Sequence, residues 1–508
     1  MKDQKKIGVV LSYAAQAVSI VSGLVYTPIM LRILGQSEYG LYQLVYSVVS
    51  YLGLLNFNLQ SAYIKFFSRT KEKDDEIEMA RLNGMFLAVF SAIAVICLIC
   101  GAVMVLNIEF IFSSGLSPNE YEKARVLFVL MIINLAITFP TSVFGSIASA
   151  HEQFFVLRLL ALLQNVLNPF LTLPLLLAGF GSVSMVVVSL FINLLKISVD
   201  IWYCIKKLNA KFLFTNLQFG LLKEIWIFSF FIFMYQIIDQ INWNVPKFIL
   251  GRLDGTVAVA IFSLGANLNS MFMSFSNVIS NVFVPKVNRI VASSNDNNEL
   301  LTILTKVGRI QFLMISIMFS GFVIFGYDFM LIWGGPGYGA SYYVALLLMG
   351  SGMVPLIQNL AMEIQRAKNM HKTCAIVNLV VAIINVLITI PLVMKFGSIG
   401  AASGTAITMV CGNVLFMNWY YKYRMGLNIT KFWLSLLSMT PAMVIPVISG
   451  LTLVYFIDTS RIISLFACIA VYGLIYLVCM YFMAMNETER ALVDTAVIKF
   501  KKILKRVN

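Results

Sequence analysis

A group of polar and charged residues interrupts an otherwise apolar stretch near the middle of the chain: Gln236, Asp239, Gln240, Asn244 and Lys247. Steps of three and four residues place them on one face of a helix. Amide and ammonium groups donate hydrogen bonds to anions and hydroxyl groups, and a carboxylate surrounded by hydrocarbon is costly unless it is paired or used. Asp239 therefore either takes up a cation or proton, pairs with Lys247 or Lys196, or serves as a structural partner.

Polar residues recur at helical spacing in three other apolar stretches. They run through Ser12, Gln16, Ser19, Gly23 and Tyr26, through Ser47, Tyr51, Asn58, Ser61 and Lys65, and through Ser263, Asn267, Ser270, Ser274, Asn277 and Asn281. Such a stripe either joins helices to one another or lines a hydrated cavity, and for stripes of this length we favour the cavity. The predicted cavity lining is Gln16, Tyr26, Arg32, Tyr51, Asn58, Lys65, Gln236, Gln240, Asn244, Lys247, Asn267 and Asn277. Arg32 and Lys65 lie near the ends of apolar stretches, where the alternative is contact with lipid headgroups.

The elements that carry these residues are long apolar helices. About 20 helical residues span the hydrocarbon core of a bilayer, and we identify fourteen stretches of that length, from residues 8–34 to residues 462–485. The connections between them are too short for an additional soluble domain. The expected fold is therefore all-α, a polytopic membrane protein with fourteen transmembrane helices.

The charge distribution predicts the orientation of these helices. The chain has 37 Lys and Arg against 23 Asp and Glu, a net charge of +14, and most basic residues fall in every second connection. Basic residues remain on the side from which helices are inserted, so both termini should be cytoplasmic. The positive charge thus reflects membrane topology, and we expect no nucleic-acid partner.

Cysteine and histidine usage gives little indication of catalysis or metal binding. The seven Cys are scattered, and Cys97 and Cys100 lie in an apolar helix without charged neighbours, which favours packing over ligation. The two His, His151 and His371, stand at predicted cytoplasmic ends. We therefore expect no cofactor, no metal and no enzyme activity.

Two segments of the chain resemble each other and suggest an internal repeat. Residues 27–44 and 245–264 both pass from a Pro-containing helix through Leu-Gly into a new helix, with six helices between the copies. The expected organisation is a six-helix bundle over 1–204, a cytoplasmic linker over 205–224, a second six-helix bundle over 225–421, two additional transmembrane helices over 422–485 and a basic cytoplasmic tail over 486–508. Residues 491–508 of that tail suit either an amphipathic helix on an anionic leaflet or a disordered segment.

Several motifs together resemble the Wzx-type oligosaccharide flippases of the multidrug, oligosaccharidyl-lipid and polysaccharide (MOP) exporter superfamily. They are the sequences LGQSEYGLY at 34–42, LNFNLQSAYIKF at 55–66, EIQRAKNMHK at 363–372 and GSIGAASGT at 397–405. This chain departs from the family pattern at three positions: Asn56 replaces a frequent Asp, Asn58 a usual Gly and Lys65 a usual Arg. A role for that acidic side chain therefore does not carry over, and Lys65 lacks the bidentate fork of Arg.

The resemblance implies a function and a set of partners. Such proteins move undecaprenyl-diphosphate-linked oligosaccharide units from the cytoplasmic to the outer leaflet of the bacterial plasma membrane by alternating access, and several are thought to use a cation gradient, H⁺ or Na⁺. A polysaccharide polymerase and glycosyltransferases would act beside them, and membrane lipids would surround them. A diphosphate needs cationic and hydrogen-bonding groups to replace its water, which the predicted lining offers.

Two other classes of protein remain as alternatives. A multidrug or toxin extrusion antiporter would share the repeat, but such transporters usually have twelve spans and often an acidic residue in the first, and the first span here has none. A polysaccharide polymerase or ligase would need a large outer loop with catalytic residues. The longest predicted outer connections, 107–123 and 327–343, are too short for that purpose.

Overall fold

A computed structural model describes residues 2–72, 75–112, 115–215, 220–368, 370–491 and 493–495. These residues form helices joined by short connections, with no β-strand among them. By their internal contacts they divide into two compact units. Unit 1 comprises Met1–Ser263 and Thr389–Ala401, and unit 2 comprises Leu264–Ile388 and Ala402–Asn508.

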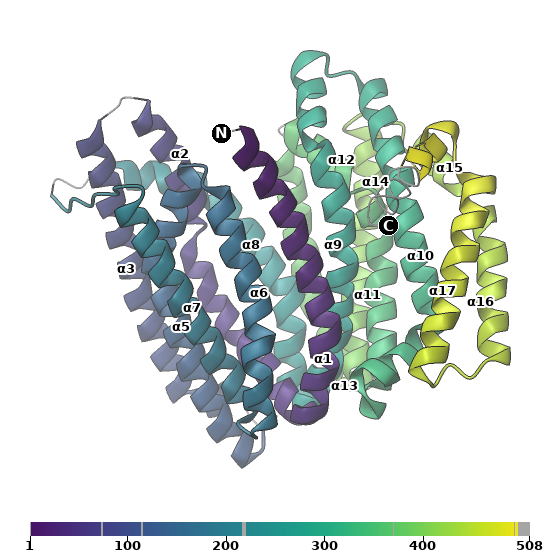
Figure 1. Cartoon of the computed structure of the whole chain (residues 1–508), viewed down its shortest axis with the longest axis horizontal. Helices are drawn as coiled ribbons and strands as arrows, with labels where there is room; N and C mark the ends of the chain where they lie inside the picture. The colour runs from purple at the N-terminus through teal and green to yellow at the C-terminus, as the bar shows by residue number, and fades with distance from the viewer. Residues whose placement is uncertain are drawn as a thin grey trace, which may run out of the picture. The chain divides into compact units, whose positions relative to one another are not determined.

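Unit 1 is built on eight helices. They are α1 (Lys2–Leu52), α2 (Leu59–Lys71), α3 (Glu76–Leu106), α4 (Ile108–Phe112), α5 (Pro118–Ala150), α6 (Phe154–Leu177), α7 (Gly181–Lys206) and α8 (Gly220–Leu253). The helix α1 packs along α6 and also contacts α5 and α8, while α5 lies between α3 and α7 (Figure 1). At Gly35 the backbone has φ 73° and leaves the helical region, which divides α1 into two helical segments.

Unit 2 is assembled around α10. Its helices are α9 (Thr256–Ser293), which enters the unit at Leu264, α10 (Asn297–Gly334), α11 (Gly339–Ile357), α12 (Asn359–Ala367), α13 (His371–Met409) without its residues 389–401, which belong to unit 1, α14 (Met417–Tyr423), α15 (Ile429–Leu437), α16 (Val444–Phe456) and α17 (Ile462–Cys479). The helix α10 contacts α11, α12, α15, α16 and α17. A buried apolar core that includes Leu304, Ile364 and Phe432 joins its neighbours.

Eleven helical segments within the described residues are long and apolar enough to cross a membrane, so the chain is a multi-pass membrane protein. Two of these segments contain a break in the helical backbone, at Gly35 and at Gly397. The 34-residue helix α8 is not among the eleven. The all-α class is thus confirmed, whereas the count of fourteen spans and the arrangement as two six-helix bundles stay predictions.

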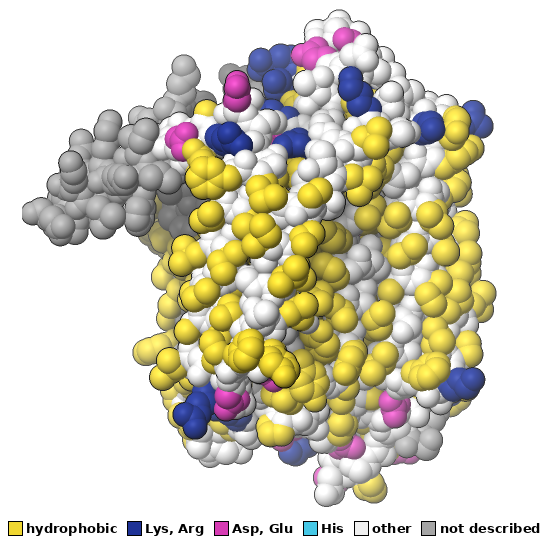
Figure 2. Space-filling model, turned by 90° about the vertical axis from the view of Figure 1, so that its right-hand side faces the viewer, with side chains coloured by type: hydrophobic (Ala, Val, Ile, Leu, Met, Phe, Trp, Pro, Cys, Tyr) yellow, Lys and Arg dark blue, Asp and Glu magenta, His cyan; other side chains and the backbone are white. Residues whose placement is uncertain are grey.

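The surface of unit 2 agrees with contact to lipid. On the side that carries α16 and α17, apolar side chains form a broad band, with charged side chains gathered above and below it (Figure 2). Tyr455, Phe456 and Ile463 are each at least 80% exposed. Side chains of this size expose so much apolar area only where hydrocarbon replaces water.

Two predictions about the chain's organisation remain open. The boundaries of the compact units differ from the predicted bundle boundaries at 204 and 225. The compact units group residues by their contacts in space, whereas the predicted bundles group helices by the repeat in the sequence. The predicted amphipathic tail at 491–508 lies almost wholly outside the described residues.

Candidate functional site

The apolar stretch over 41–66, which the sequence predicts as one unbroken helix, is interrupted in the structure. The helix α1 ends at Leu52, a 3₁₀ turn η1 (Gly53–Asn56) follows, and α2 begins at Leu59. Between them Phe57 and Asn58 adopt left-handed backbone conformations, with φ of 44° and 51°. Two consecutive non-glycine residues in this region are uncommon, and irregular backbone at membrane depth requires cover by protein or a water-filled cavity.

This interruption corrects the predicted stripe from Ser47 to Lys65. A single helical face cannot run through residues 53–58, so Asn58 does not continue the stripe of Ser47 and Tyr51. Instead the Asn58 carbonyl and side-chain oxygens accept hydrogen bonds from the Ser61 N and Oγ, at 3.1 and 3.3 Å, which start α2. Lys65 lies on the exposed side of α2, with its Nζ 5.9 Å from the Phe66 ring centroid.

The helix α8 packs beside the interruption. The rings of Phe57 and Phe233 lie 4.5 Å apart between their centroids. On α1, η1 and α8, four buried polar atoms have no hydrogen-bond partner among the described residues: Tyr51 OH, Asn56 Oδ1, Ser229 Oγ and Gln236 Oε1. Buried polar groups are costly without a partner, so this part of unit 1 is suited to water or to a polar ligand.

Further along the same two helices, amide and hydroxyl groups meet in a row that we call the polar seam, formed by Gln43 and Ser50 of α1 and Gln240, Asn244 and Lys247 of α8. The Ser50 Oγ donates to the Gln240 Oε1 at 3.0 Å, and the Asn244 Nδ2 donates to the same oxygen. The Lys247 Nζ donates to the Gln43 Oε1 at 3.4 Å, and the Gln43 Nε2 donates to the Tyr39 OH at 3.1 Å. The structure therefore brings three of the predicted residues together and adds two that the sequence analysis missed.

Gln43 and Ser50 had a detectable signal. With Ser47 they form a stripe at steps of four and three, on the helical segment that follows Gly35. The prediction started the polar stripe at Ser47 and therefore omitted Gln43.

Lys247 is the cation of the polar seam. Its described hydrogen bond is to a neutral amide, and no ion pair to a carboxylate is found for it within the described part of the chain. Lys247 is half-buried, and a buried ammonium group needs a countercharge or water to offset its desolvation. The seam therefore suits an anionic group with hydrogen-bonding neighbours.

The remaining predicted residues of unit 1 occupy different surroundings. Asp239 lies on an exposed part of α8, next to Gln240 in sequence. Gln16 and Tyr26 are half-buried in the first segment of α1, the segment whose Ala15 carbonyl accepts a 3.5 Å hydrogen bond from the Asn165 Nδ2 of α6. Arg32 is exposed near the end of that segment.

In unit 2, α9 separates its polar residues onto two faces. Ser270, Asn277 and Asn281 are exposed, and the Asn277 Oδ1 accepts a 2.7 Å hydrogen bond from the Asn359 Nδ2. The opposite face is dry: Ser276 is buried, and its Oγ donates to the Leu356 carbonyl at 2.8 Å. The predicted stripe is thus accessible around Asn277, while Asn267 is half-buried.

Two charge pairs form within single helices, and one of them gives Lys196 a carboxylate partner other than Asp239. The Lys196 Nζ lies 3.0 Å from the Asp200 Oδ2 on α7, and the Arg366 Nη1 lies 2.7 Å from the Glu363 Oε1 on α12. These pairs explain the charges without a ligand. No cluster of three or more metal-ligating side chains occurs among the residues that the structure describes.

One end of unit 1 is held by two carboxylates. Glu38, just after the break at Gly35, accepts hydrogen bonds from the Ser182 N at 2.7 Å and from the Lys123 Nζ at 3.1 Å. Burial raises the pKa of Glu38, but the hydrogen bonds from Ser182 and Lys123 outweigh it and leave the pKa below its ordinary value. Glu38 thereby ties α1 to the first turns of α5 and α7.

Glu120 forms a second junction at this end. Its Oε1 accepts hydrogen bonds from the Ser37 Oγ at 2.6 Å and from the Thr256 Oγ1 at 2.8 Å. Its Oε2 accepts from the Ser117 N at 2.8 Å in a capping box that begins α5. The sequence analysis did not single out either carboxylate, since their partners are distant in the chain.

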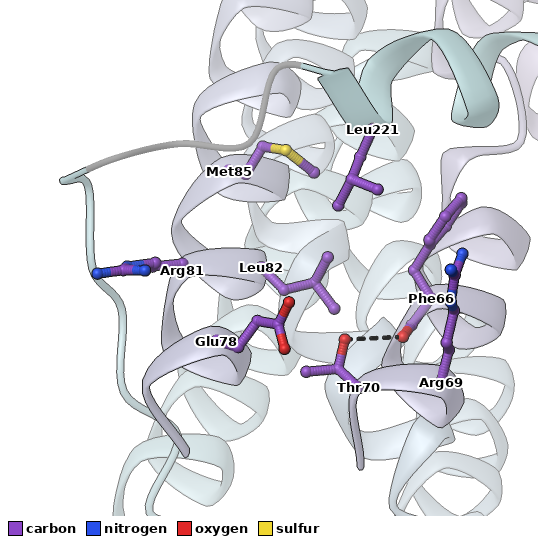
Figure 3. Close-up of a pocket in the computed structure, with 8 residues that line it drawn as sticks. All are labelled: Phe66, Arg69, Thr70, Glu78, Arg81, Leu82, Met85 and Leu221. Atoms are coloured by element: carbon purple, nitrogen blue, oxygen red, sulfur yellow. Dashed lines mark hydrogen bonds between the residues drawn. The ribbon is translucent and has the colours of Figure 1, made fainter. Parts of the chain in front are cut away.

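A separate small cavity of about 160 Å³ opens where α2, α3 and α8 meet (Figure 3). Glu78 and Thr70 lie at its floor, and the Thr70 Oγ1 donates to the Phe66 carbonyl at 3.1 Å. The guanidinium groups of Arg69 and Arg81 lie on opposite sides of it and do not converge. The cavity is therefore a weaker candidate for an anionic ligand than the polar seam.

The fold defines the class of protein. The chain superposes with a TM-score of 0.77 on the lipid II flippase MurJ in an inward closed conformation, at 17% identity over 95% of this chain and 100% of that one. It also matches an inward-facing multidrug resistance MATE family transporter of the MOP superfamily, with a TM-score of 0.56 and 15% identity over 80% of this chain and 93% of that one. The protein thus has the fold shared by these flippases and transporters.

The chain belongs to the family described as polysaccharide biosynthesis protein, whose model matches residues 7–291. It is 21% identical to the uncharacterized membrane protein EpsK of Bacillus subtilis over 78% of each chain. It is 23% identical to the capsular polysaccharide biosynthesis protein CapF of Staphylococcus aureus over 44% of this chain and 56% of CapF. It is 21% identical to the probable low-salt glycan biosynthesis flippase Agl15 of Haloferax volcanii over 31% of this chain, a match that spans 33% of Agl15. The resemblance to MOP-superfamily flippases is confirmed.

Proposed function

We propose that this protein moves undecaprenyl-diphosphate-linked oligosaccharide units from the cytoplasmic to the outer leaflet of a bacterial plasma membrane, for the biosynthesis of a surface polysaccharide. Membership in the polysaccharide biosynthesis family and the similarity to a flippase fold support this proposal. Both termini would be cytoplasmic, and two six-helix bundles would open alternately to either side. The protein would transport without catalysing a reaction, using no cofactor.

The observation that carries the proposal is the position of Lys247. It places a cation, whose described hydrogen bond is to the neutral Gln43, in a row of amides on a membrane helix. A diphosphate supplies the missing countercharge, and the amides and hydroxyls of Ser50, Gln240 and Asn244 match sugar hydroxyl groups. The lipid tail would remain in hydrocarbon while the headgroup crosses.

The interruption at 53–58 supports a moving helix at the same place. Irregular backbone within a span leaves carbonyl and N–H groups for a ligand or for water, and it supplies a hinge. The remaining predicted residues of unit 1, among them Gln16 and Tyr26, would extend the proposed binding surface along the first segment of α1.

We propose Asp239 as the residue that couples transport to H⁺ or Na⁺. It is an exposed carboxylate on a membrane helix, in the same turn of α8 as Gln236 and Gln240. Protonation or cation binding there would change the charge beside the polar seam. A polysaccharide polymerase and glycosyltransferases would act as partners before and after transport.

The decisive experiment uses proteoliposomes loaded with purified undecaprenyl-diphosphate oligosaccharide. A membrane-impermeant glycosidase added outside removes only the sugar that reaches the outer leaflet. With the protein present, we expect cleavage to proceed beyond the share initially exposed, and empty liposomes and liposomes with heat-inactivated protein serve as controls. Cleavage that stops at the same level in all three samples would refute the proposal.

A multidrug and toxin extrusion antiporter is the second candidate function, because the MATE fold also matches. The same proteoliposomes distinguish it. Exchange of a fluorescent organic cation such as ethidium, in the absence of sugar-lipid movement, would favour extrusion. The genomic neighbourhood is a further discriminator, since adjacent glycosyltransferase genes favour the flippase.

A further inference from the structure

A second cationic cavity lies in unit 2, away from the residues assigned to transport. It measures about 590 Å³ and is formed by the first turns of α10, by α15 and by the segment after α17. Its lining is Asn298, Leu301, Thr302, Thr305, Lys306, Arg309, Lys431, Ser435, Asn486, Thr488 and Glu489. On α10 these residues follow one another at helical spacing, so a single face of the helix is turned to the cavity.

The charges in this cavity do not cancel. Arg309 and Glu489 form a buried bidentate ion pair, with 2.6 Å between Arg309 Nε and Glu489 Oε1 and 2.9 Å between Nη2 and Oε2. Glu489 is the only carboxylate among the lining residues, and this pair neutralises it. Lys306 and Lys431 are exposed, and neither side-chain ammonium group makes an ion pair or a hydrogen bond within the part of the chain that the structure describes. Two positive charges thus remain at the cavity.

A network of hydrogen bonds holds the floor of the cavity. The Arg309 Nη1 donates to the Ser435 carbonyl at 3.0 Å, and its Nη2 donates to the Ala484 carbonyl at 2.8 Å. Glu489 also accepts from the Asn486 N at 3.0 Å, while its own N donates to the Asn486 Oδ1 at 2.9 Å. This network fixes α10, α15 and the segment after α17 to one another. The two lysines and the Thr305 and Thr488 hydroxyls therefore surround a preformed opening.

Hydrocarbon-facing side chains adjoin the cavity. Leu434 and Leu437 follow Lys431 on α15 and are 63% and 56% exposed. On the side of unit 2 that carries α16 and α17, charged side chains lie at the border of the apolar band (Figure 2). Lys431 therefore lies beside exposed apolar side chains of its own helix, which offer a surface for acyl chains.

We propose that this cavity binds the phosphate of an anionic phospholipid, such as phosphatidylglycerol or cardiolipin, with Lys306 and Lys431 as its cationic ligands and the hydroxyls of Thr305 and Thr488 as additional donors. The bound lipid fastens α15 and the segment after α17 to α10. This site is independent of the proposed transport function, because none of its ligands belongs to the polar seam or to the exposed face of α9.

The test uses the full chain purified in mild detergent and native mass spectrometry with added lipid. We expect the wild type to retain phosphatidylglycerol or cardiolipin in preference to phosphatidylcholine. The double variant K306A/K431A should lower the affinity for the anionic lipid about 5-fold for each lysine removed. The matched control K206A/K207A removes two exposed lysines from the end of α7 in unit 1 and should leave the affinity unchanged.

A second measurement separates the lipid from free phosphate. Thermal unfolding is followed with inorganic phosphate, with a short-chain phosphatidylglycerol and with a short-chain phosphatidylcholine. We expect only phosphatidylglycerol to raise the Tm of the wild type, and the rise to disappear in K306A/K431A. Equal lipid retention by the wild type and the double variant would overturn the proposal. A Tm increase by inorganic phosphate without lipid retention would overturn the assignment to a lipid.

Discussion

Lys247 of α8 donates a hydrogen bond to Gln43 of α1 across 3.4 Å, and the two residues are 204 positions apart in the chain. The contact joins the helical segment after Gly35 to the helix that carries Asp239. Because its described side-chain hydrogen bond is to a neutral amide, the Lys247 ammonium group would gain electrostatic energy by exchanging Gln43 for an anion. The first two predictions concern this helix.

Replacing Lys247 by Ala should reduce sugar-lipid movement in proteoliposomes by about ten- to a hundredfold, the effect of losing one charge-assisted hydrogen bond. Lys247→Arg keeps the charge and should retain part of the activity. Lys223→Ala, an exposed lysine at the start of the same helix, serves as the matched control and should behave as the wild type. Full activity of Lys247→Ala would remove the lysine from the transport path.

Replacing Asp239 by Asn should abolish the response to an imposed H⁺ or Na⁺ gradient while leaving gradient-independent movement measurable. The reason is that the Asn amide neither takes up a proton near neutral pH nor supplies a full negative charge to a cation. The measurement compares initial rates with and without the gradient. If the ratio of these rates is unchanged in Asp239→Asn, the coupling residue lies elsewhere.

The left-handed backbone at Asn58 predicts a specific order of variants. Asn58→Gly should preserve or raise stability, since Gly adopts positive φ without strain. Asn58→Val should lower stability by about 1–2 kcal/mol, because a β-branched residue is disfavoured there. Unfolding of the detergent-solubilised protein by denaturant measures the difference in stability between each variant and the wild type. Gln60→Val, at a helical position of α2, is the control. An equal cost at both positions would contradict the prediction.

The buried ion pair between Arg309 and Glu489 should respond to single and double replacement differently. Glu489→Leu leaves a buried guanidinium without its countercharge and should cost about 3–5 kcal/mol of unfolding free energy. The double variant Arg309→Met, Glu489→Leu should cost less than either single change, because no uncompensated charge remains. Denaturant titration of Arg309→Met, Glu489→Leu and the double variant completes a double-mutant cycle. Additive costs would show that the pair does not act as a unit.

Glu38 predicts a dependence of stability on pH. Its pKa in the folded protein is below the ordinary value of 4.5, so its carboxylate stabilises the fold fully above that value, and the contribution is lost as the pH falls through the lowered pKa. Glu38→Gln should therefore have a lower Tm than the wild type at pH 7. The gap should close as the pH is lowered below 4.5 toward the folded pKa. Because the wild type and Glu38→Gln both contain Glu120, the difference between their Tm values reports on Glu38 alone. A gap that is constant with pH would exclude the carboxylate as its cause.

The amino-acid sequence by itself determined the membrane class, the all-helical fold and the family. These depend on local motifs and on the length of apolar stretches. The length must match the thickness of the bilayer, and a helix satisfies its own backbone hydrogen bonds there. Helical spacing also identified Gln240, Asn244 and Lys247 as one face of α8, since a shared face is a property of a single helix.

Only the tertiary structure decided which of these faces meet and where a helix is interrupted. The break at 53–58 was missed because the single Gly53 is tolerated inside an apolar helix. The left-handed backbone of Phe57 and Asn58 is accompanied by long-range contacts such as the packing of Phe57 on Phe233. The partners of Lys247, Glu38 and Arg309 are distant in the chain, so hydrophobic periodicity carries no information about them. Burial and charge balance depend on these long-range contacts, which is the physical reason that the two lysines beside Arg309 became visible as a site only in the folded chain.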